Sequence, residues 1–455
     1  MDAQILNKLS ETFALQPDSA KVMIAGLGKT GFSIAKFLRA GNFNVLVADS
    51  RSNPPLQERL QREMPEVQLF TGGFAAALSG PLTHLLVSPG LSLQRAVFQQ
   101  LIRHGVRLLS DIDLFACAAA APVVAITGSN GKSTVTTMLG CMAEQSGINV
   151  KIGGNLGVPA LELLDDAAEL YVLELSSFQL ERVTQLAAAV GVVLNVSADH
   201  MDRYPDLATY AAAKARVYNG NGIMVINADD TMASAMAEKG RQVLSFALDQ
   251  PADFHLSAST QEAYLMAQGR RLLRAGDLPL AGRHNLSNAL AALALGNAIG
   301  LTEAAMLQAL KNFQGLDHRM QRVAYIDGIT WINDSKATNI GACIAALQGV
   351  EHKVILIAGG DAKGADMREL APAVIAKAKA VILIGKDARL IANVLHDCVA
   401  VFFAADLYQA VERAAELAHA GESVLLSPAC ASLDQFENYQ QRGQKFAAAV
   451  RELVA

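Results

Sequence analysis

A glycine-rich loop between an apolar run and a helical pattern sets the strongest limit on what this chain folds into. The loop reads T-G-S-N-G-K-S-T over residues 127–134, after the apolar run Val123–Ile126 and at the start of a helical pattern that extends to about Gln145. A buried strand, a glycine turn and a helix in this order predict an α/β fold built on a parallel sheet. They argue against an all-β sandwich, a coiled coil and a fibre.

The same rhythm recurs along the chain. Short apolar runs followed by turn residues end at Ala25, Ala48, Phe70, Val87, Leu109, Gly153, Glu174, Asn195 and Asn227. In the last third, strands are expected at Val354–Ala358, Val381–Ile384, Val399–Phe403 and Val424–Ser427. The segment 254–279 lacks this rhythm and predicts an antiparallel appendage. Helices follow at about 285–299 and 302–313, with Thr302 as the N-cap of the second.

The chain length suggests how these units group. At about 150 residues per domain, 455 residues predict three domains. An alanine-rich stretch at 116–122 and the segment Gln314–Leu316 are candidate junctions. We therefore expect a Rossmann-like N-terminal domain at 1–111, a central domain of the P-loop type with a parallel sheet at 112–315, and a Rossmann-like C-terminal domain at 316–455.

Composition excludes several classes of protein. The net charge of −5 argues against a broad nucleic-acid-binding surface, and no apolar run is long enough to span a bilayer. No signal peptide is recognisable at the N-terminus, so we expect a cytoplasmic protein without membrane insertion. The five cysteines are scattered without metal-site spacing, and reduced thiols are expected.

The loop at 127–134 has the chemistry of a phosphate cradle. Gly128 and Gly131 let backbone N–H groups point inward, and the helix start adds partial positive charge. Lys132 can reach the outer phosphates of a nucleotide, and the Ser133 hydroxyl can ligate Mg²⁺. Ile126 stands where the usual P-loop has a glycine, so the loop is a variant. The structural alternative is a glycine turn with a surface lysine.

A second glycine loop lies near the N-terminus. G-L-G-K-T-G at residues 26–31 follows a strand and precedes a helix, and Asp49 ends the next strand. The pattern predicts a ligand that carries a diphosphate, with Asp49 on a ribose. A tight structural turn is the alternative.

Further polar residues follow strands of the inferred sheets. Glu174 ends an apolar strand and is a candidate Mg²⁺ ligand, and His200 falls on the same sheet edge. Arg319 lies just past the second junction, where it can reach a phosphate when domains close. N-D-S-K-A-T-N at 333–339 has a solvated loop as its alternative. Cys430 suggests a nucleophile, but no histidine is near in sequence, which favours a structural role.

Together these motifs resemble the Mur ligases, the ATP-dependent amide-forming enzymes of peptidoglycan precursor synthesis. The resemblance covers residues 26 to about 443 in the family's order. Besides the two glycine loops, it rests on D-H-M-D-R-Y at 199–204, G-R-H-N-L-S-N-A at 282–289, N-D-S-K-A-T-N at 333–339 and S-P-A-C-A-S-L-D-Q-F at 427–436. Within the family, this set is similar to the branch that adds D-glutamate to UDP-N-acetylmuramoyl-L-alanine (UDP-MurNAc-L-Ala) through an acyl phosphate and a tetrahedral intermediate.

The resemblance assigns roles to positions of this chain. Catalytic residues are Lys132, His200, Lys214 and Lys336. The ATP site comprises Gly128, Asn130, Gly131, Lys132, Ser133, Thr134, Asn288, Arg319 and Asp334. The UDP-substrate site comprises Gly28, Thr30, Asp49, Ser50, Arg51, Asn155 and His200. The D-glutamate site comprises Thr338, Lys363, Ser432 and Tyr439. Two Mg²⁺ ions are implied, with ligands Ser133, Glu174, His200 and Lys214, the last as a carbamate.

Three rival hypotheses accompany this interpretation. An NAD-dependent dehydrogenase would explain the first glycine loop and Asp49, but not Lys132 or Asp334. A non-catalytic nucleotide-gated protein would keep Lys132 without needing Glu174, His200 or Lys214. A third rival is a ligase of the same family that adds another amino acid. We expect a monomer whose partners are small molecules: ATP, D-glutamate and UDP-MurNAc-L-Ala.

Overall fold

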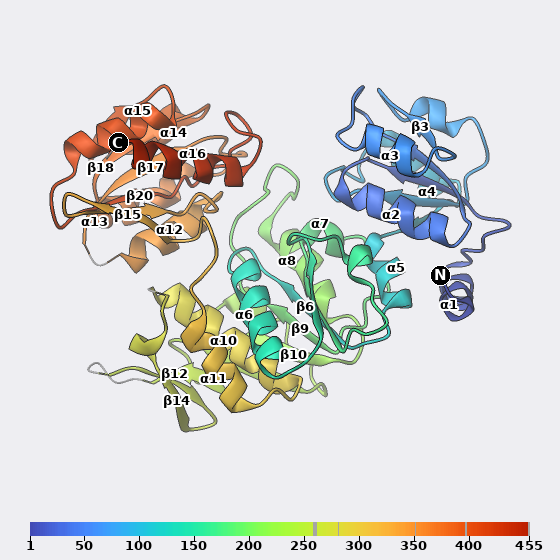
Figure 1. Ribbon diagram of the computed structural model, residues 1–455, viewed down its shortest axis with the longest axis horizontal. Helices are drawn as coiled ribbons and strands as arrows, with labels where there is room; N and C mark the ends of the chain where they lie inside the picture. The colour runs from blue at the N-terminus through green and yellow to red at the C-terminus, as the bar shows by residue number, and fades with distance from the viewer. Residues whose placement is uncertain (258–261, 281, 351, 396–397, 454–455) are drawn as a thin grey trace.

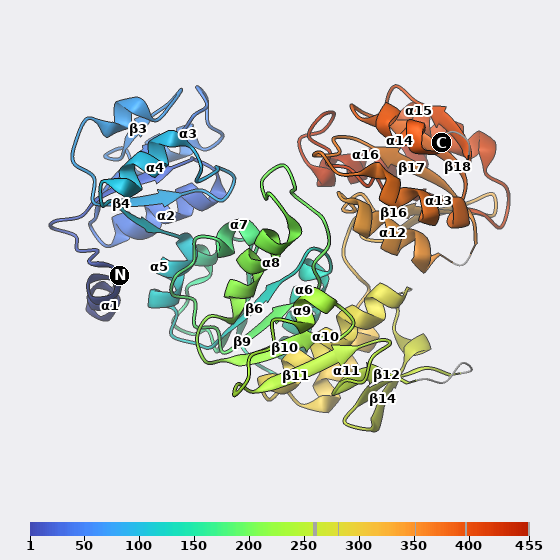
Figure 2. The same cartoon turned by 180° about the vertical axis from the view of Figure 1, so that it is seen from behind.

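Three α/β domains follow one another along the chain (Figure 1). The structure is a computed structural model, and it describes residues 1–257, 262–280, 282–350, 352–395 and 398–453. The N-terminal and C-terminal domains form two lobes on the same side of the central domain, as Figure 2 shows from behind. Within the described ranges, no helix is both long and apolar enough to cross a membrane.

The N-terminal domain is built on a five-stranded parallel sheet of order β3-β2-β1-β4-β5. Its strands are β1 Lys21–Ala25, β2 Asn44–Ala48, β3 Gln68–Phe70, β4 His84–Val87 and β5 Arg107–Leu109. Its helices are α1 Ala3–Phe13, α2 Lys29–Ala40, α3 Gln57–Glu63 and α4 Ala96–Arg103. The first glycine loop joins β1 to α2, at the carboxyl edge of the sheet where such folds bind ligands.

The central domain contains a nine-stranded sheet of order β14-β13-β12-β11-β10-β9-β6-β8-β7. Its strands are β6 Val123–Thr127, β7 Val150–Gly154, β8 Leu170–Glu174, β9 Val190–Val193, β10 Ile223–Asn227, β11 Val243–Ala247, β12 Phe254–Leu256, β13 Tyr264–Ala267 and β14 Arg270–Arg274. The expected appendage at 254–279 is therefore corrected: β12 pairs in parallel with β11 and extends the main sheet, and only β13 and β14 add antiparallel pairing. Residues 258–261 of that segment lie outside the described residues.

The helices of the central domain are α5 Asp111–Ala118, α6 Lys132–Gln145, α7 Ser177–Leu180, α8 Leu207–Ala215, α9 Thr231–Ser234, α10 Arg283–Ala298 and α11 Glu303–Asn312. Helices α6, α10 and α11 share one apolar cluster on one face of the sheet. Thr302 occupies the N-cap position of α11 as expected, but its side chain makes no capping hydrogen bond.

The C-terminal domain has a six-stranded sheet of order β15-β16-β20-β17-β18-β19. Its strands are β15 Gln321–Ile326, β16 Ile329–Asn333, β17 Val354–Gly359, β18 Ala378–Ile384, β19 Ala400–Phe403 and β20 Ser423–Leu426. Its helices are α12 Ile340–Gly349, α13 Ala371–Lys377, α14 Ala388–Leu395, α15 Leu407–Leu417 and α16 Tyr439–Glu452. The sheet is mixed, because β15 and β16 form an antiparallel hairpin. The sequence did not indicate β15.

Candidate active site

A polar cavity of about 430 Å³ lies between the central and C-terminal domains. Its walls come from the nucleotide loop after β6, the ends of β8 and β9, the start of α10, and the segment after β16. The sequence-predicted site residues on these walls are Asn130, Gly131, Lys132, Ser133, Thr134, Asn155, Glu174, His200, Lys214, Asn288, Arg319, Asp334, Lys336, Thr338 and Lys363. The fold thus brings together side chains from two domains.

The nucleotide loop needs its glycines for steric reasons. Gly128 and Gly131 have φ of +154° and +84°, in the region that favours glycine. A Cβ on Gly131 would lie 2.5 Å from the Asn288 Oδ1 atom. Asn195 holds the loop through two hydrogen bonds. Its backbone oxygen accepts from the Ser129 N–H at 2.9 Å, and its side-chain oxygen accepts from the Asn130 N–H at 2.8 Å. The loop is therefore a fixed cradle at the start of α6.

Two lysines converge on one carbonyl of this loop. The Lys132 amine donates to the Gly128 and Ser129 carbonyls at 2.8 and 2.9 Å, and the Lys214 amine donates to the Gly128 carbonyl at 2.8 Å. Lys214 is 1% exposed and lies over the Tyr210 ring at 4.2 Å. Burial lowers the pKa of Lys214 well below its ordinary value, and the nearby charge of Lys132 adds to the shift. Lys132 thus contacts its own loop in this structure.

Glu174 is the centre of a hydrogen-bonded chain across the cavity floor. Its carboxylate accepts from the Ser133 hydroxyl and from the Asn155 amide, each at 2.6 Å, and Arg319 donates to the Ser133 Oγ atom at 2.8 Å. Burial raises the pKa of Glu174, but Lys132 and these hydrogen bonds lower it by more, so the pKa lies below the ordinary value. Glu174 is therefore held as a carboxylate, and Arg319 already bridges the two domains.

His200 lines the same cavity, and it has a partner, Asp199, that was not predicted from the sequence. Its φ of +58° is unusual for a non-glycine residue, and its ring packs against Phe178 at 4.7 Å. Burial lowers the pKa of His200 to about 4, against the opposing charge of Asp199. The Asp199 carboxylate also lies 3.5 Å from the Lys363 amine. Asp199 adjoins His200 in the same polar run after β9, which was the available signal.

The side chains of this cavity fit a magnesium ion only if substrate phosphates supply the remaining ligands. In the part of the chain that the structure describes, there is no group of three or more His, Cys, Asp or Glu side chains that could hold a metal. Magnesium in nucleotide enzymes usually takes one or two protein ligands and completes its shell with water and substrate phosphates. The paired oxygens of Ser133 and Glu174 match that mode.

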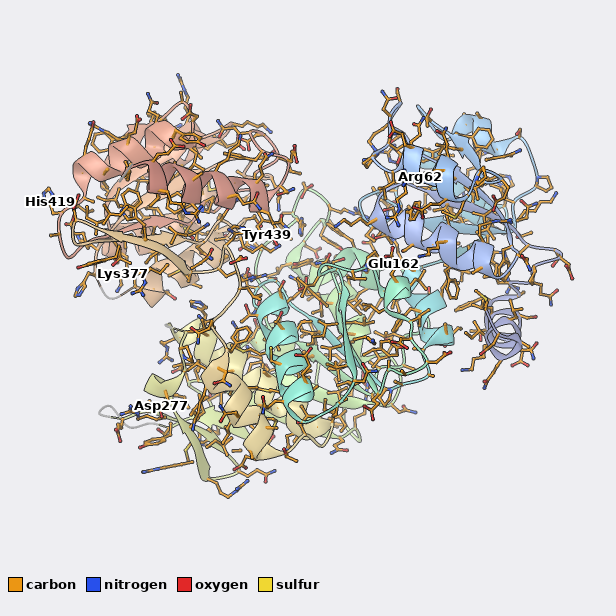
Figure 3. The ribbon with its side chains drawn as sticks, in the orientation of Figure 1. Arg62, Glu162, Asp277, Lys377, His419 and Tyr439 are labelled. Atoms are coloured by element: carbon orange, nitrogen blue, oxygen red, sulfur yellow. The ribbon has the colours of Figure 1, made fainter. Side chains whose placement is uncertain are left out.

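The segment after β16 supplies the cavity's C-terminal wall. Burial raises the pKa of Asp334 to about 7; its oxygens accept from the Ser427 hydroxyl (2.9 Å) and the Met320 N–H (3.2 Å). Burial and the charge of Arg319 lower the pKa of Lys336 to about 7, and the Lys336 amine lies 3.9 Å from the Tyr439 ring centre. Figure 3 shows Tyr439 on the side of the C-terminal domain that faces the central domain.

Some predicted site residues do not line this cavity, although Tyr439 contacts Lys336, which does. Ser432 and Tyr439 are not among its wall residues, and Ser432 is only 3% exposed. Cys430 is buried and its pKa is raised to about 12, because burial disfavours the thiolate. The burial of this thiol supports the structural role that the sequence favoured. All five cysteines are free.

The residues predicted for the UDP end gather in the N-terminal domain, apart from the cavity. They are Gly28, Thr30, Asp49, Ser50 and Arg51. The carboxylate of Asp49 accepts from the Leu27 N–H at 2.7 Å and forms a two-point pair with the Arg51 guanidinium at 2.9 and 2.7 Å. Asp49 therefore holds the first glycine loop in shape and orients Arg51, and the ribose contact expected of its carboxylate stays a prediction.

Comparisons with known proteins agree with this architecture. The family model described as "Mur ligase middle domain" matches residues 126–296, "Mur ligase MurD-like, N-terminal domain" matches 20–110, and "Mur ligase, glutamate ligase domain" matches 318–430. A pseudomurein peptide ligase type C from Methanothermus fervidus has the same fold, with a TM-score of 0.64 and 18% identity over 96% of this chain and 100% of that chain.

Relatives of higher identity cover nearly the whole chain. The UDP-N-acetylmuramoylalanine--D-glutamate ligase of Methylococcus capsulatus is 53% identical over 437 residues, which are 96% of this chain and 95% of the relative. The protein of the same name from Nitrosococcus oceani is 49% identical over 447 residues, 97% of this chain and 99% of the relative. With three matching domain models in order and relatives at this identity, the chain belongs to the Mur ligase family.

Proposed function

We propose that this chain is an ATP-dependent ligase that joins D-glutamate to UDP-MurNAc-L-Ala in peptidoglycan precursor synthesis. The observation that carries the proposal is the shared cavity, in which the nucleotide loop and Glu174 of the central domain face Arg319, Lys336 and Lys363 of the C-terminal domain. The names of the relatives at 53% and 49% identity support the choice of substrate within the family.

The nucleotide loop and the residues facing it are suited to ATP. Backbone N–H groups of Gly131 to Thr134, beside Asn130, and the Lys132 amine would bind the phosphates, once Lys132 leaves the loop carbonyls. Asn288 and Asp334 line the same cavity and are proposed to contact the rest of the nucleotide. Bound as a chelate of the phosphates, Mg²⁺ would neutralise charge that develops on the γ-phosphoryl group.

Ser133 and Glu174 would hold one Mg²⁺ ion, and His200 and Lys214 a second. The lowered pKa of His200 leaves its imidazole neutral and able to ligate. The lowered pKa of Lys214 favours the unprotonated amine, which is the form that adds carbon dioxide. The resulting carbamate would be a carboxylate-like ligand in place of an ammonium.

The reaction then follows in two steps. A carboxylate oxygen of UDP-MurNAc-L-Ala attacks the γ-phosphorus of ATP, the bond to the ADP oxygen breaks, and an acyl phosphate forms. The D-glutamate amine attacks the acyl carbon to form a tetrahedral intermediate, the nitrogen loses a proton, and phosphate leaves as the amide forms. Lys132 and Arg319 would offset the repulsion between carboxylate and triphosphate, and preorganised charges of this kind account for much of enzymatic rate enhancement.

The other two substrates would come from the flanking domains. Gly28, Thr30, Ser50 and Arg51, with Asp49 behind them, would bind the uridine end, and Asn155 the muramoyl part. Lys336, Thr338, Lys363, Ser432 and Tyr439 would receive D-glutamate. We assign these roles to domains at 1–111, 112–315 and 316–455, in a monomer that works in the cytoplasm.

Phosphate release is the direct test. The protein is incubated with ATP, Mg²⁺ and UDP-MurNAc-L-Ala, with and without D-glutamate, and we expect release that depends on D-glutamate. Parallel reactions with L-glutamate and L-alanine examine the rival ligase, and Lys132→Ala, which removes transition-state charge stabilisation, should lose roughly 10²-fold or more in rate. Equal release with and without any amino acid would refute the ligase and favour a nucleotide-gated protein.

A further inference from the structure

Among the described residues, three side chains of the C-terminal domain make polar contacts across its seam with the central domain. Arg319 donates to Ser133 at 2.8 Å, Lys363 lies 3.5 Å from Asp199, and Asn339 reaches across between them. In the proposed function, which the following inference assumes, Arg319 and Lys363 bind substrates. Their seam contacts must therefore be exchanged when substrates enter. Asn339 has no such assignment.

The Asn339 amide is fixed at both ends. Its oxygen accepts from the Ala342 N–H at 2.8 Å and caps helix α12, so its nitrogen must point the other way. That nitrogen donates to the Asp199 Oδ2 atom at 3.1 Å and to the Asn130 Oδ1 atom at 3.3 Å. The side chain is largely buried. One amide thus joins the start of a C-terminal helix to two central-domain loops.

Both of those loops belong to the site. Asn130 sits in the phosphate cradle, where Asn195 holds its backbone N–H at 2.8 Å. Asp199 adjoins His200 and contacts its ring at 3.6 Å. A contact that fixes Asn130 and Asp199 together therefore sets the distance between the two sides of the cavity, whatever substrate Arg319 and Lys363 hold.

Close packing at Gly341, two residues after Asn339, is independent evidence that the start of α12 is fixed against the central domain. A Cβ on Gly341 would lie 3.2 Å from the Ser197 Oγ atom and 3.5 Å from the Asn130 Nδ2 atom. The start of α12 thus lies close against the central domain, and a side chain at Gly341 would have to displace the Ser197 hydroxyl by a few tenths of an ångström.

We propose that Asn339 is a positioning residue, which sets the register of the C-terminal domain on the nucleotide loop and keeps the seam closed while Arg319 and Lys363 exchange partners. It touches none of the reacting atoms. Its effect is expected in kcat and in domain closure, with nucleotide affinity of the central domain retained.

Asn339→Asp keeps the helix-capping contact of this side chain and disrupts its contact with the central domain. The carboxylate still accepts from the Ala342 N–H, but it faces the Asp199 carboxylate as a like charge. We expect kcat to fall roughly tenfold or more, because misplaced reacting groups are costly. We also expect ADP affinity and melting temperature near those of the unsubstituted chain, and a larger radius of gyration in small-angle scattering. Asn438→Asp is the matched control, since Asn438 caps α16 through the Gln441 N–H (2.8 Å) on the exposed surface.

A double-mutant cycle sharpens the test. In the background of Asp199→Asn, an aspartate at position 339 meets an amide instead of a carboxylate. The second substitution should then cost less than about threefold in kcat, a coupling that loss of a helix cap alone would not produce. Gly341→Ala, which favours the helix but crowds Ser197, should lower kcat without Asn339 being changed.

Two measurements, kcat and the radius of gyration, decide whether Asn339 is a positioning residue. An unchanged kcat in both Asn339→Asp and Gly341→Ala, or a reduced kcat with an unchanged radius of gyration in both, would overturn the proposal. If the unsubstituted chain releases no phosphate with D-glutamate, the proposed function fails first, and the scattering comparison still decides the role of Asn339.

Discussion

The central domain meets its two neighbours in different ways. Toward the N-terminal domain, one apolar cluster runs without a break from Leu38 and Leu109 to Leu180 and Tyr218. Toward the C-terminal domain the contacts include polar side chains of the site itself, and the two large apolar clusters of that domain stay within residues 320–453. The first junction is built as a core, and the second as a set of exchangeable hydrogen bonds.

Two arginines reinforce the N-terminal junction. Arg182 donates to the Val87 carbonyl at 2.6 Å and also to the Leu91 carbonyl, and Arg203 donates to the Pro89 and Leu91 carbonyls at 3.1 and 3.0 Å. The stretch around residue 200 rises between the two lobes (Figure 2), and it carries both Arg203 and the Asp199 that Asn339 contacts. The contrast implies that ligands rearrange the C-terminal seam and leave the N-terminal one in place.

Arg319→Ala should give the largest effect, because it removes a cation that bridges the C-terminal seam and faces the nucleotide loop. We expect a rate loss of roughly 10²-fold or more, with little change in the free energy of unfolding. Steady-state phosphate release and urea unfolding measure the two. Arg322→Ala, on the exposed part of β15, is the control. A large loss of stability with normal turnover would show that Arg319 serves folding and not catalysis.

Lys214→Ala tests a site residue that lies in neither junction. Loss of the proposed carbamate ligand should reduce activity at least about tenfold, and neither scattering nor nucleotide-induced closure should change. Lys151→Ala, which breaks only an ion pair with Asp165 at 2.7 Å, controls for removal of a lysine from the same domain. A fully active Lys214→Ala would eliminate the carbamate.

Arg182→Ala addresses the N-terminal junction. It leaves the buried Val87 carbonyl without its charged donor, while the Leu91 carbonyl keeps Arg203, so the free energy of unfolding should fall by about 1–3 kcal/mol. The Michaelis constant for UDP-MurNAc-L-Ala should rise more than that for ATP. Arg216→Ala removes an arginine that donates to the Glu181 carbonyl from an exposed position and is the control. Unchanged denaturant midpoints would contradict a junction built as a core.

The pH dependence of stability should carry opposite signs in the two lobes. The pKa of Asp334 is about 7 when folded and 3.8 in the reference state, so the folded chain binds more protons between these values. Stability from this group therefore falls as pH rises from about 4 to 7, by at most about 1.4 kcal/mol per pH unit. Asp49, with a folded pKa of about 2, contributes stability that is lost as pH falls from about 4 to 2.

Urea unfolding of Asp334→Asn across pH 4 to 7 measures the first contribution. The variant should show a shallower decline of stability with rising pH than the unsubstituted chain, while Asp317→Asn, on the exposed surface, should not. A decline as steep in Asp334→Asn as in the unsubstituted chain would assign the effect to other groups.

Hydrogen exchange should show the smallest effect. A non-hydrolysable ATP analogue should slow amide exchange at 129–133 and 339–342, the two sides of the C-terminal seam. Exchange at 87–91 should stay the same, because the arginines already hold that loop. Equal protection at both junctions would remove the distinction between them.

The sequence predicted what local patterns determine. Strand ends at Ala25, Ala48 and Glu174 and the cradle at 127–134 depend on runs of apolar residues and on glycine, and the structure agrees with them. The fold class followed from these units. Strand β15 was missed because Q-R-V-A-Y-I contains too many polar residues for a buried strand, and its side chains are indeed partly exposed.

Contacts between distant residues could not be predicted in this way. Nothing near Lys214 in sequence indicates that its amine meets the Gly128 carbonyl, and Asn339 looked like the end of a polar loop. Asp49 shows the same limit: its position after a strand predicted a ribose contact, but gave no sign of its hydrogen bonds with Leu27 and Arg51. Such pairings are set by the packing of whole domains.

The arginine clamp on residues 87–91 has a consequence for how this protein can vary. Arg182 and Arg203 hold main-chain carbonyls, which every amino acid possesses, so the side chains of Val87, Pro89 and Leu91 are not what they recognise. Random mutagenesis of Pro89 and Gly90 should therefore yield many functional clones as long as the backbone keeps its path, whereas Val87 and Leu91 are also constrained by their packing in an apolar cluster. The two arginines should tolerate almost no replacement. For these hydrogen bonds, the sequence is thus constrained at the two arginines of the central domain and not at the carbonyl residues of the N-terminal domain.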